Sequence, residues 1–251
     1  MRDSRRAARP PSDLELQLPE GSAGRRRLQT TLGAGEPPIV VASMSRAGST
    51  VLHKGVARSW ARARFGAEAA RFAPLLEEAA WRLDETPLIG GVVYKTHDLP
   101  ENLPRAARAK VLFTYRRASD VALSLAHCRD RLGDAWFMKA RRNLRGRGRY
   151  ENFLREDTLG LEGQVDGWSR AEGVDVLGLR YETLWDHIGD VEEFLGFKVK
   201  VRGRRASIRP PPPSELAEIL AETYGPADRK IDAMPDLFVR RAAPDAATAT
   251  G

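Results

Sequence analysis

The sequence predicts a three-layer α/β sandwich with a mainly parallel central sheet. Two observations favour it. Short β-branched or apolar runs alternate with stretches of helical periodicity, and small or polar residues follow several of these runs. The chain of 251 residues has the length of one ordinary domain, and it shows no internal repeat.

The elements follow one another as strand, loop and helix. Four apolar runs predict strands, and periodic apolar residues predict helices between and after them; Gly196 is expected to end one of these helices. Near-helical spacing predicts one further helical stretch within 70–83. The expected strands are 39–41, 91–95, 111–115 and 174–179, and the expected helices are 50–64, 121–128, 184–195 and 214–222.

The folded domain is expected to span residues 39–239. Residues 1–38 are rich in Arg, Pro and Gly without a hydrophobic period, which predicts a flexible basic tail, and 240–251 predict a flexible C-terminal tail. Residues 130–160 have weak periodicity and are expected to form a lid or mobile excursion. Pro210–Pro213 predicts an extended spacer.

The net charge of +7 is concentrated in two windows. Lys139–Arg149 and Lys198–Arg209 each carry six cations and no acid, while the remainder of the chain is net negative. Such windows are most often solvated surface, but they can also bind a polyanionic ligand or acceptor.

Cysteine content and hydropathy exclude several classes of protein. Cys128 is the only cysteine, so no intrachain disulfide and no multi-cysteine metal site can form, which favours a cytoplasmic location. No apolar run approaches the roughly 20 residues of a membrane span. The first residues lack the apolar stretch of a secretory signal.

The first motif is Ser43–Thr50, between the first strand and its helix. A turn there directs free backbone N–H groups and the positive helix end at one point, and Gly48 permits close approach of an oxyanion. The Walker pattern does not fit, because Ser49 rather than Lys follows Gly48. The alternative is a plain turn in which Ser49 or Thr50 caps the helix.

Two further motifs also stand at strand ends. Lys95 and His97 alternate along a strand and should share one face, supplying a cation and a base to one cleft. Arg116 and Ser124, from a turn and the following helix, can converge on a phosphate. The structural alternatives are that His97 is a packing residue and that a local Arg117–Asp120 ion pair accompanies a helix cap at Ser119.

Together these motifs resemble the sulfotransferases that use 3′-phosphoadenosine-5′-phosphosulfate (PAPS). Five features of that family occur here in the same order. They are its phosphosulfate loop, its Lys-Thr-His-x-x-Pro segment, an Arg and a Ser eight residues apart, its Tyr-Glu-Asp-Leu segment and its Phe-Leu-Gly segment. They correspond to Ser45–Thr50, Lys95–Pro104, Arg116 with Ser124, Tyr181–Leu184 and Phe194–Gly196.

This sequence also departs from the family pattern. Ser45 stands where Pro is usual, and Arg46 replaces the usual Lys. Val51 occupies the position of an adenine-stacking Trp. The late Arg-Lys-Gly segment is matched only loosely by Arg202–Arg205.

The resemblance implies a P-loop-like sulfotransferase fold. It also implies that a sulfuryl group is transferred from PAPS, without a metal, to a hydroxyl or amine of a carbohydrate or small molecule. The product released from the donor would be 3′-phosphoadenosine-5′-phosphate (PAP). The resemblance implies His97 as base, titrating near the usual pH of about 6–7 or lower because of Lys95, and Arg46 and Lys95 as stabilising cations. The implied donor-binding residues are Arg46, Ala47, Gly48, Ser49, Thr50, Val51, Arg116, Ser124, Tyr181, Arg202 and Arg204.

Two other functions remain open. A P-loop nucleotide kinase or other NTP-binding protein would share the strand-loop-helix architecture, and a nucleic-acid binder would use the cationic windows. The second leaves Lys95 and His97 unexplained, so no nucleic-acid partner is expected. The acceptor pocket is expected within 67–86 and 130–160, which indicate neither the acceptor nor an oligomeric state.

Overall fold

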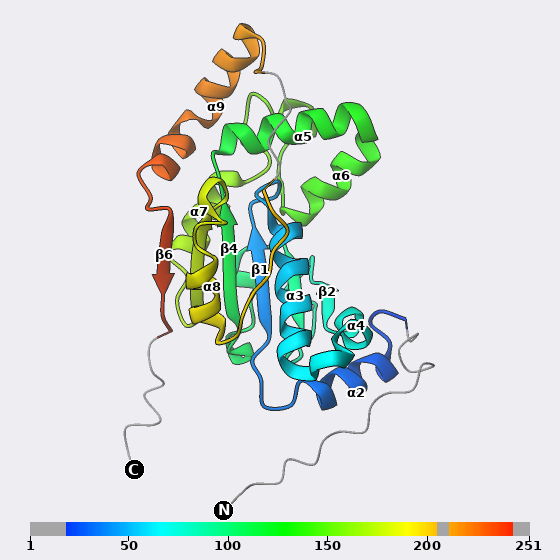
Figure 1. Cartoon of the computed structure of the whole chain (residues 1–251). Coiled ribbons are helices and arrows are strands. Elements are labelled where there is room, and N and C mark those ends of the chain that lie inside the picture. The colour runs from blue at the N-terminus through cyan, green and yellow to red at the C-terminus, as the bar shows by residue number, and fades with distance from the viewer. Residues whose placement is uncertain (1–18, 205–210, 243–251) are drawn as a thin grey trace, which may run out of the picture.

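A six-stranded sheet forms the centre of the computed structural model, which describes residues 19–204 and 211–242 (Figure 1). The strand order is β2-β3-β1-β4-β5-β6. Neighbouring strands pair in parallel except for β6, which is antiparallel to β5. The expected fold class is confirmed. The strands are β1 (Ile39–Ser43), β2 (Glu77–Ala79), β3 (Val93–Thr96), β4 (Lys110–Tyr115), β5 (Asp175–Arg180) and β6 (Leu237–Arg240).

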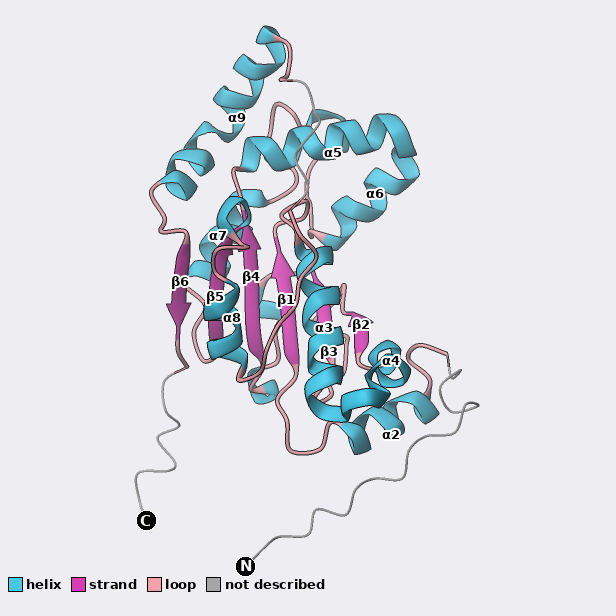
Figure 2. Cartoon of the chain, in the orientation of Figure 1, coloured by secondary structure: helices cyan, strands magenta, loops and turns pink. Residues whose placement is uncertain are grey.

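Helices cover both faces of this sheet, and short 3₁₀ turns connect several elements (Figure 2). None of the helices within the described residues has the length and apolarity that a membrane crossing requires. The helices are α2 (Ala23–Leu32), α3 (Ser49–Phe65), α4 (Ala69–Phe72), α5 (Ala118–Leu132), α6 (Asp134–Asn143), α7 (Leu161–Ser169), α8 (Ile188–Leu195) and α9 (Ser214–Asp232).

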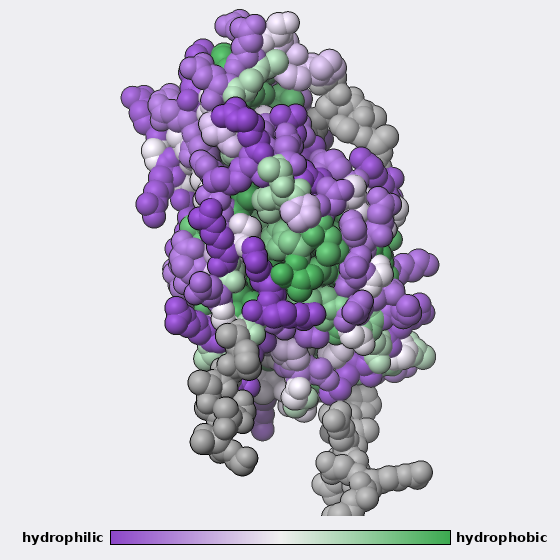
Figure 3. Space-filling model, turned by 90° about the vertical axis from the view of Figure 1, so that its left-hand side faces the viewer, coloured by the Kyte–Doolittle hydropathy of each residue, from purple (hydrophilic) through white to green (hydrophobic). Residues whose placement is uncertain are grey.

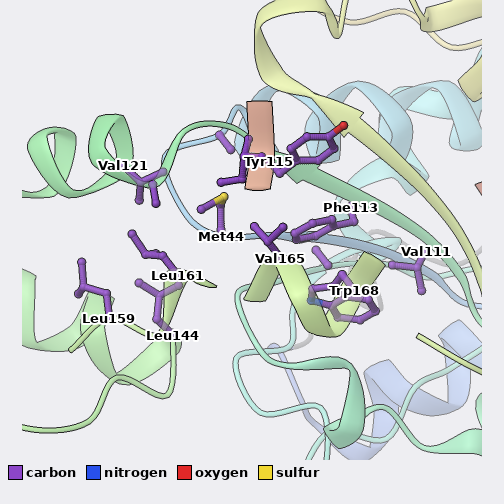
Figure 4. Close-up of a cluster of buried hydrophobic side chains, with 14 of the residues drawn as sticks. Met44, Val111, Phe113, Tyr115, Val121, Leu144, Leu159, Leu161, Val165 and Trp168 are labelled. Carbon is purple, nitrogen blue, oxygen red and sulfur yellow. The ribbon is translucent and has the colours of Figure 1, made fainter. Parts of the chain in front are cut away.

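Side-chain alternation along the strands produces two cores. Val41 and Leu112 point to the face covered by α3 and α8. Phe113 points to the other face and stacks on Trp168 of α7, with ring centroids 6.0 Å apart (Figure 4). The central strands are buried on both faces, which explains why they appear in the sequence as continuous apolar runs.

The expectation of a flexible tail up to residue 38 is wrong for the described part of that segment. Helix α2 packs on the edge of the sheet through polar side chains: Arg25 Nε donates to Glu78 at 3.2 Å, and Gln29 Nε2 donates to the Leu75 carbonyl at 2.7 Å. Arg25 and Gln29 are buried. Because polar residues make these contacts, no hydrophobic period marks the helix. Residues 1–18 lie outside the described residues.

The region 70–83 is not the single helical stretch that was predicted. Short helical turns there lead into the edge strand β2, whose residues Glu77–Ala79 have little intrinsic strand propensity. Pairing with β3 and the contacts to α2 hold the strand in place.

The last part of the chain contains more structure than predicted. Helix α9 continues to Asp232 past Pro226, because Tyr224 and Ile231 are buried against the core. Strand β6 extends into the segment expected to be a flexible tail, and residues 243–251 lie outside the described residues. Gly196 ends α8 in a left-handed conformation as predicted, although that helix begins only at Ile188.

Strand β6 forms one edge of the sheet. Figure 3 shows this side of the molecule, where a hydrophobic area lies within a hydrophilic surround. Val239 of the edge strand is 43% exposed.

The segment 130–160 is packed rather than a mobile excursion. It contains helix α6, and Phe137, Leu144 and Phe153 are buried in the core shared with α7 and α9. Figure 4 shows Leu144 beside Leu159 and Leu161. The apolar residues are spaced over several turns and loops, which explains their weak periodicity.

Candidate active site

A cleft of about 1170 Å³ lies at the carboxyl ends of the central strands. Strands β1, β3 and β4 run in the same direction, so the segments that follow them meet at one edge of the sheet. Most of the sequence-predicted site residues line this cleft. They are Arg46, Gly48, Ser49, Thr50, Val51, Lys95, His97, Arg116, Tyr181 and Arg204.

Three predicted donor-binding residues are not part of the cleft lining. Ala47 is fully buried in the core. Ser124 is also fully buried, and its hydroxyl accepts a hydrogen bond from Arg46 Nε at 2.9 Å. The carbonyl of Arg202 accepts a hydrogen bond from Trp185 Nε1. Arg205 lies outside the described residues.

The loop between β1 and α3 has an unusual backbone. Ser45 and Arg46 have φ angles of 65° and 49°, and Gly48 has a φ of 79° at the N-cap of α3. A Cβ at Gly48 would lie 2.5 Å from Cδ2 of Tyr181. No side chain caps α3, so the alternative cap by Ser49 or Thr50 is wrong. The first amides of the helix are available to an anion.

Lys95 projects from β3 toward the same helix end. Its Nζ donates a hydrogen bond to Thr50 Oγ1 at 2.7 Å, and it lies 5.5 Å from the ring centroid of Trp81. Burial lowers the pKa of Lys95 to about 8, with further contributions from the positive charges of Arg46 and Lys54. This cation is therefore held in a region of positive potential.

His97 is buried beside the end of β1, and its Nδ1 lies 3.0 Å from both the carbonyl oxygen and the hydroxyl of Ser43. A carbonyl can only accept, so we assign the proton to Nδ1 and the free lone pair to Nε2. Burial, followed by the charges of Lys95 and Arg46, lowers the pKa of His97 to about 3. The shift has the direction expected from Lys95, but it takes the pKa well below the usual range of about 6–7.

Arg116 follows β4 and is surrounded by acids and an aromatic ring. Its guanidinium pairs with Asp120 at 2.8 Å and with Glu182 at 3.3 Å, and it lies 5.2 Å from the ring centroid of Tyr181. The buried Nε of Arg116 has no hydrogen-bond partner among the described residues.

The predicted Arg117–Asp120 pair and Ser119 cap are wrong. Arg117 pairs instead with Asp228 and Asp232. Ser119 hydrogen-bonds Asp228 through its amide and its hydroxyl, while the N-cap of α5 is Arg117.

Sequence reasoning missed a buried ion pair behind His97. Asp98 is fully buried and accepts hydrogen bonds from Arg145 at 2.8 and 2.9 Å, while Arg145 also reaches Asp84. Burial alone would raise the pKa of Asp98, but these bonds and those from Leu83, Leu99 and Asn102 lower it. The only sequence signal was an acid directly after the candidate base.

Several cleft residues were also missed. They occupy the regions where the acceptor pocket was expected, together with α5 and the residue after Tyr181. They are Trp81, Trp136, Lys139, Asn143, Leu123, Asp120 and Glu182. Among the described residues, no group of His, Cys, Asp and Glu side chains is arranged to hold a metal ion.

Comparisons with known proteins give matches among solved structures. No protein-family model matches the chain, and no curated protein matches its sequence. Among solved structures, the chain is similar to a crystal structure of mouse sulfotransferase SULT7A1 complexed with PAP. The two are 17% identical, the match covers 90% of this chain and 75% of that chain, and the TM-score is 0.39. The likeness is distant in sequence and in geometry.

Proposed function

We propose that this chain is a sulfotransferase that moves a sulfuryl group from PAPS to a hydroxyl or amine of an acceptor and releases PAP. One observation carries the proposal: a helix end without a side-chain cap, two cations and a histidine with a free nitrogen meet in one cleft. The helix end follows Gly48, the cations are Arg46 and Lys95, and the histidine is His97.

The donor would bind along the end of the sheet. The first amides of α3 suit the 5′-phosphate, because Gly48 lets an oxyanion approach and the helix end is positive. Arg116 suits the 3′-phosphate, since its buried Nε has no partner among the described residues. Tyr181, whose ring packs against Gly48, would border the nucleoside.

The transfer itself needs alignment and charge stabilisation. The acceptor oxygen or nitrogen forms a bond to sulfur while the bond from sulfur to the 5′-phosphate oxygen breaks. His97 Nε2 takes the proton that the acceptor loses. Arg46, Lys95 and the α3 amides stabilise the negative charge that gathers on the leaving phosphate.

Thermal shift separates this function from its alternatives. We expect PAP to raise the melting temperature without Mg²⁺, whereas a kinase would respond to ATP with Mg²⁺ and a nucleic-acid binder to an oligonucleotide. Incubation with PAPS and an acceptor library should then give products heavier by one SO₃. No stabilisation by PAP would contradict the proposal.

The 3′-phosphate assignment has its own test. Arg116→Ala should weaken binding of PAP far more than that of adenosine 5′-phosphate, because only PAP carries the phosphate that Arg116 would contact. Arg117→Ala is the matched control, since that side chain is absent from the cleft lining and pairs with Asp228. Equal losses for both nucleotides would remove Arg116 from this role.

A further inference from the structure

The part of the cleft lining that α6 contributes has a distinct composition. Trp136, Lys139, Ala140 and Asn143 line the cleft from one face of α6, as their helical spacing requires. The contact of Arg145 with Asp98 fixes the end of α6 beside His97. We call Trp81, Trp136, Lys139 and Asn143 the acceptor wall.

The acceptor wall combines flat apolar rings with a cation. Trp81 lies 5.3 Å from the ring of His97, centroid to centroid. Lys139 is exposed and has no ion-pair or hydrogen-bond partner among the described residues. By contrast, Arg46, Lys95 and Arg116 all hold neighbouring side chains. Lys139 is thus available to bind a ligand other than the donor nucleotide.

We propose that the acceptor is an acidic saccharide, an inference that rests on the proposed sulfotransferase function. A sugar ring would lie against Trp81 or Trp136, its carboxylate or sulfate would pair with Lys139, and Asn143 would hydrogen-bond a hydroxyl. The reacting hydroxyl or amine would then face His97.

Two features of the cleft favour this class over a neutral aromatic acceptor. Lys139 and Asn143 place a cation and an amide beside the rings of the acceptor wall, whereas pockets for apolar ligands are lined mainly by apolar groups. Arg46 and Lys95 also create a positive potential at His97, which a negative group on the acceptor would offset. Exposed Arg142, three residues beyond Lys139 on α6, extends the positive charge outside the cleft.

The first experiment compares three acceptors with the full chain. Acceptor binding is measured with the chain saturated with PAP, and sulfation is measured with PAPS supplied. The probes are a tetrasaccharide of alternating glucuronic acid and N-acetylglucosamine, the same tetrasaccharide with methyl-esterified carboxylates, and 4-nitrophenol. We expect binding and sulfation of the acidic tetrasaccharide, with kcat/KM at least about tenfold above that of the ester. A preference for the ester or for 4-nitrophenol overturns the inference, as does PAP binding without any binding of the acidic tetrasaccharide.

The second experiment tests Lys139 itself. Lys139→Glu should raise the KM for the acidic tetrasaccharide about tenfold and remove its advantage over the ester, while the affinity for PAP stays within about twofold. Lys200→Glu makes the same change of charge at an exposed position that is absent from the cleft lining and should change neither value. An unchanged preference in Lys139→Glu overturns the inference. Failure of the wild-type chain to bind PAP would instead contradict the sulfotransferase proposal.

Discussion

The two sides of the cleft are built in different ways. On the donor side, each proposed reactive group is held by a near neighbour: Arg46 by Ser124 at 2.9 Å, Lys95 by Thr50 at 2.7 Å and His97 by Ser43 at 3.0 Å. On the acceptor wall, Lys139 has no such partner among the described residues. That wall is instead held from behind, through the buried pair of Asp98 and Arg145.

This difference matches the demands of the proposed chemistry. Charge stabilisation in a transition state is strongest when the stabilising groups need no reorganisation, which favours the fixed donor side. A recognition surface can vary in sequence as long as its backbone is held. Asp98 and Arg145 provide that support without lining the cleft.

The largest expected effect comes from the proposed base. His97→Ala should lower turnover by about 10²-fold or more while leaving PAP affinity nearly unchanged, because the imidazole would meet the acceptor. Turnover and nucleotide binding are measured on the same preparation. His187→Ala, at a histidine absent from the cleft lining, is the control. A variant with a lowered melting temperature and normal specific activity would make His97 a packing residue.

Breaking the support behind the acceptor wall should destabilise the fold. Arg145→Ala leaves the fully buried carboxylate of Asp98 without its cation and should cost about 3 kcal/mol in the free energy of unfolding. Urea denaturation measures this cost. Adding Asp98→Asn should recover part of it, because the lone buried charge disappears. Purely additive losses would show that the two side chains are not coupled.

The pH dependence tests the electrostatics of the donor side. The low pKa of His97, about 3, keeps its imidazole neutral across the usual assay range. The pKa of Lys95, about 8, means that its positive charge is lost as the pH rises further. The kcat/KM should therefore be flat at neutral pH and fall about tenfold per pH unit in the alkaline range. Lys95→Arg should remove this alkaline limb, whereas an acidic limb near neutrality would contradict the burial of His97.

Substitution of Ser124 distinguishes two possible roles for this residue, direct contact with a donor phosphate and positioning of Arg46. The sequence predicts that Ser124 contacts a phosphate of the donor together with Arg116, but in the structure its hydroxyl accepts a hydrogen bond from Arg46. If Ser124 acts by positioning Arg46, Ser124→Ala should lower kcat about tenfold in the wild type and have no effect in an Arg46→Ala background. Ser124→Thr, which keeps the hydroxyl, should restore part of the rate. A loss confined to PAP affinity and present in both backgrounds would support direct phosphate contact.

The sequence predicts the elements that have a local pattern and misses those that depend on contacts between distant residues. Strands such as β1 and β4 are buried on both faces, so apolar runs revealed them, and Lys95, His97 and Arg116 were found because they follow strand ends. Strand β2 and helix α2 depend on polar contacts between distant residues, which leave no local pattern. Asn143 and Trp136 reach the cleft because buried Phe137 and Leu144 anchor α6 and its neighbouring turn, and because Arg145 pairs with Asp98, 47 residues away in the chain.

The smallest expected effect concerns the acids around Arg116. Glu182 is partly exposed and pairs with Arg116 at 3.3 Å, so its carboxylate would repel a 3′-phosphate bound to the same guanidinium. Glu182→Gln keeps the shape and removes the charge, and it should tighten PAP binding about threefold without changing the affinity for adenosine 5′-phosphate. Glu193→Gln, on the exposed side of α8, is the control for net charge. Titration calorimetry at low salt gives both affinities. Weaker PAP binding by Glu182→Gln would mean that the carboxylate of Glu182 orients Arg116 toward the phosphate. Glu182 would then be one of the neighbours that fix the donor side in place.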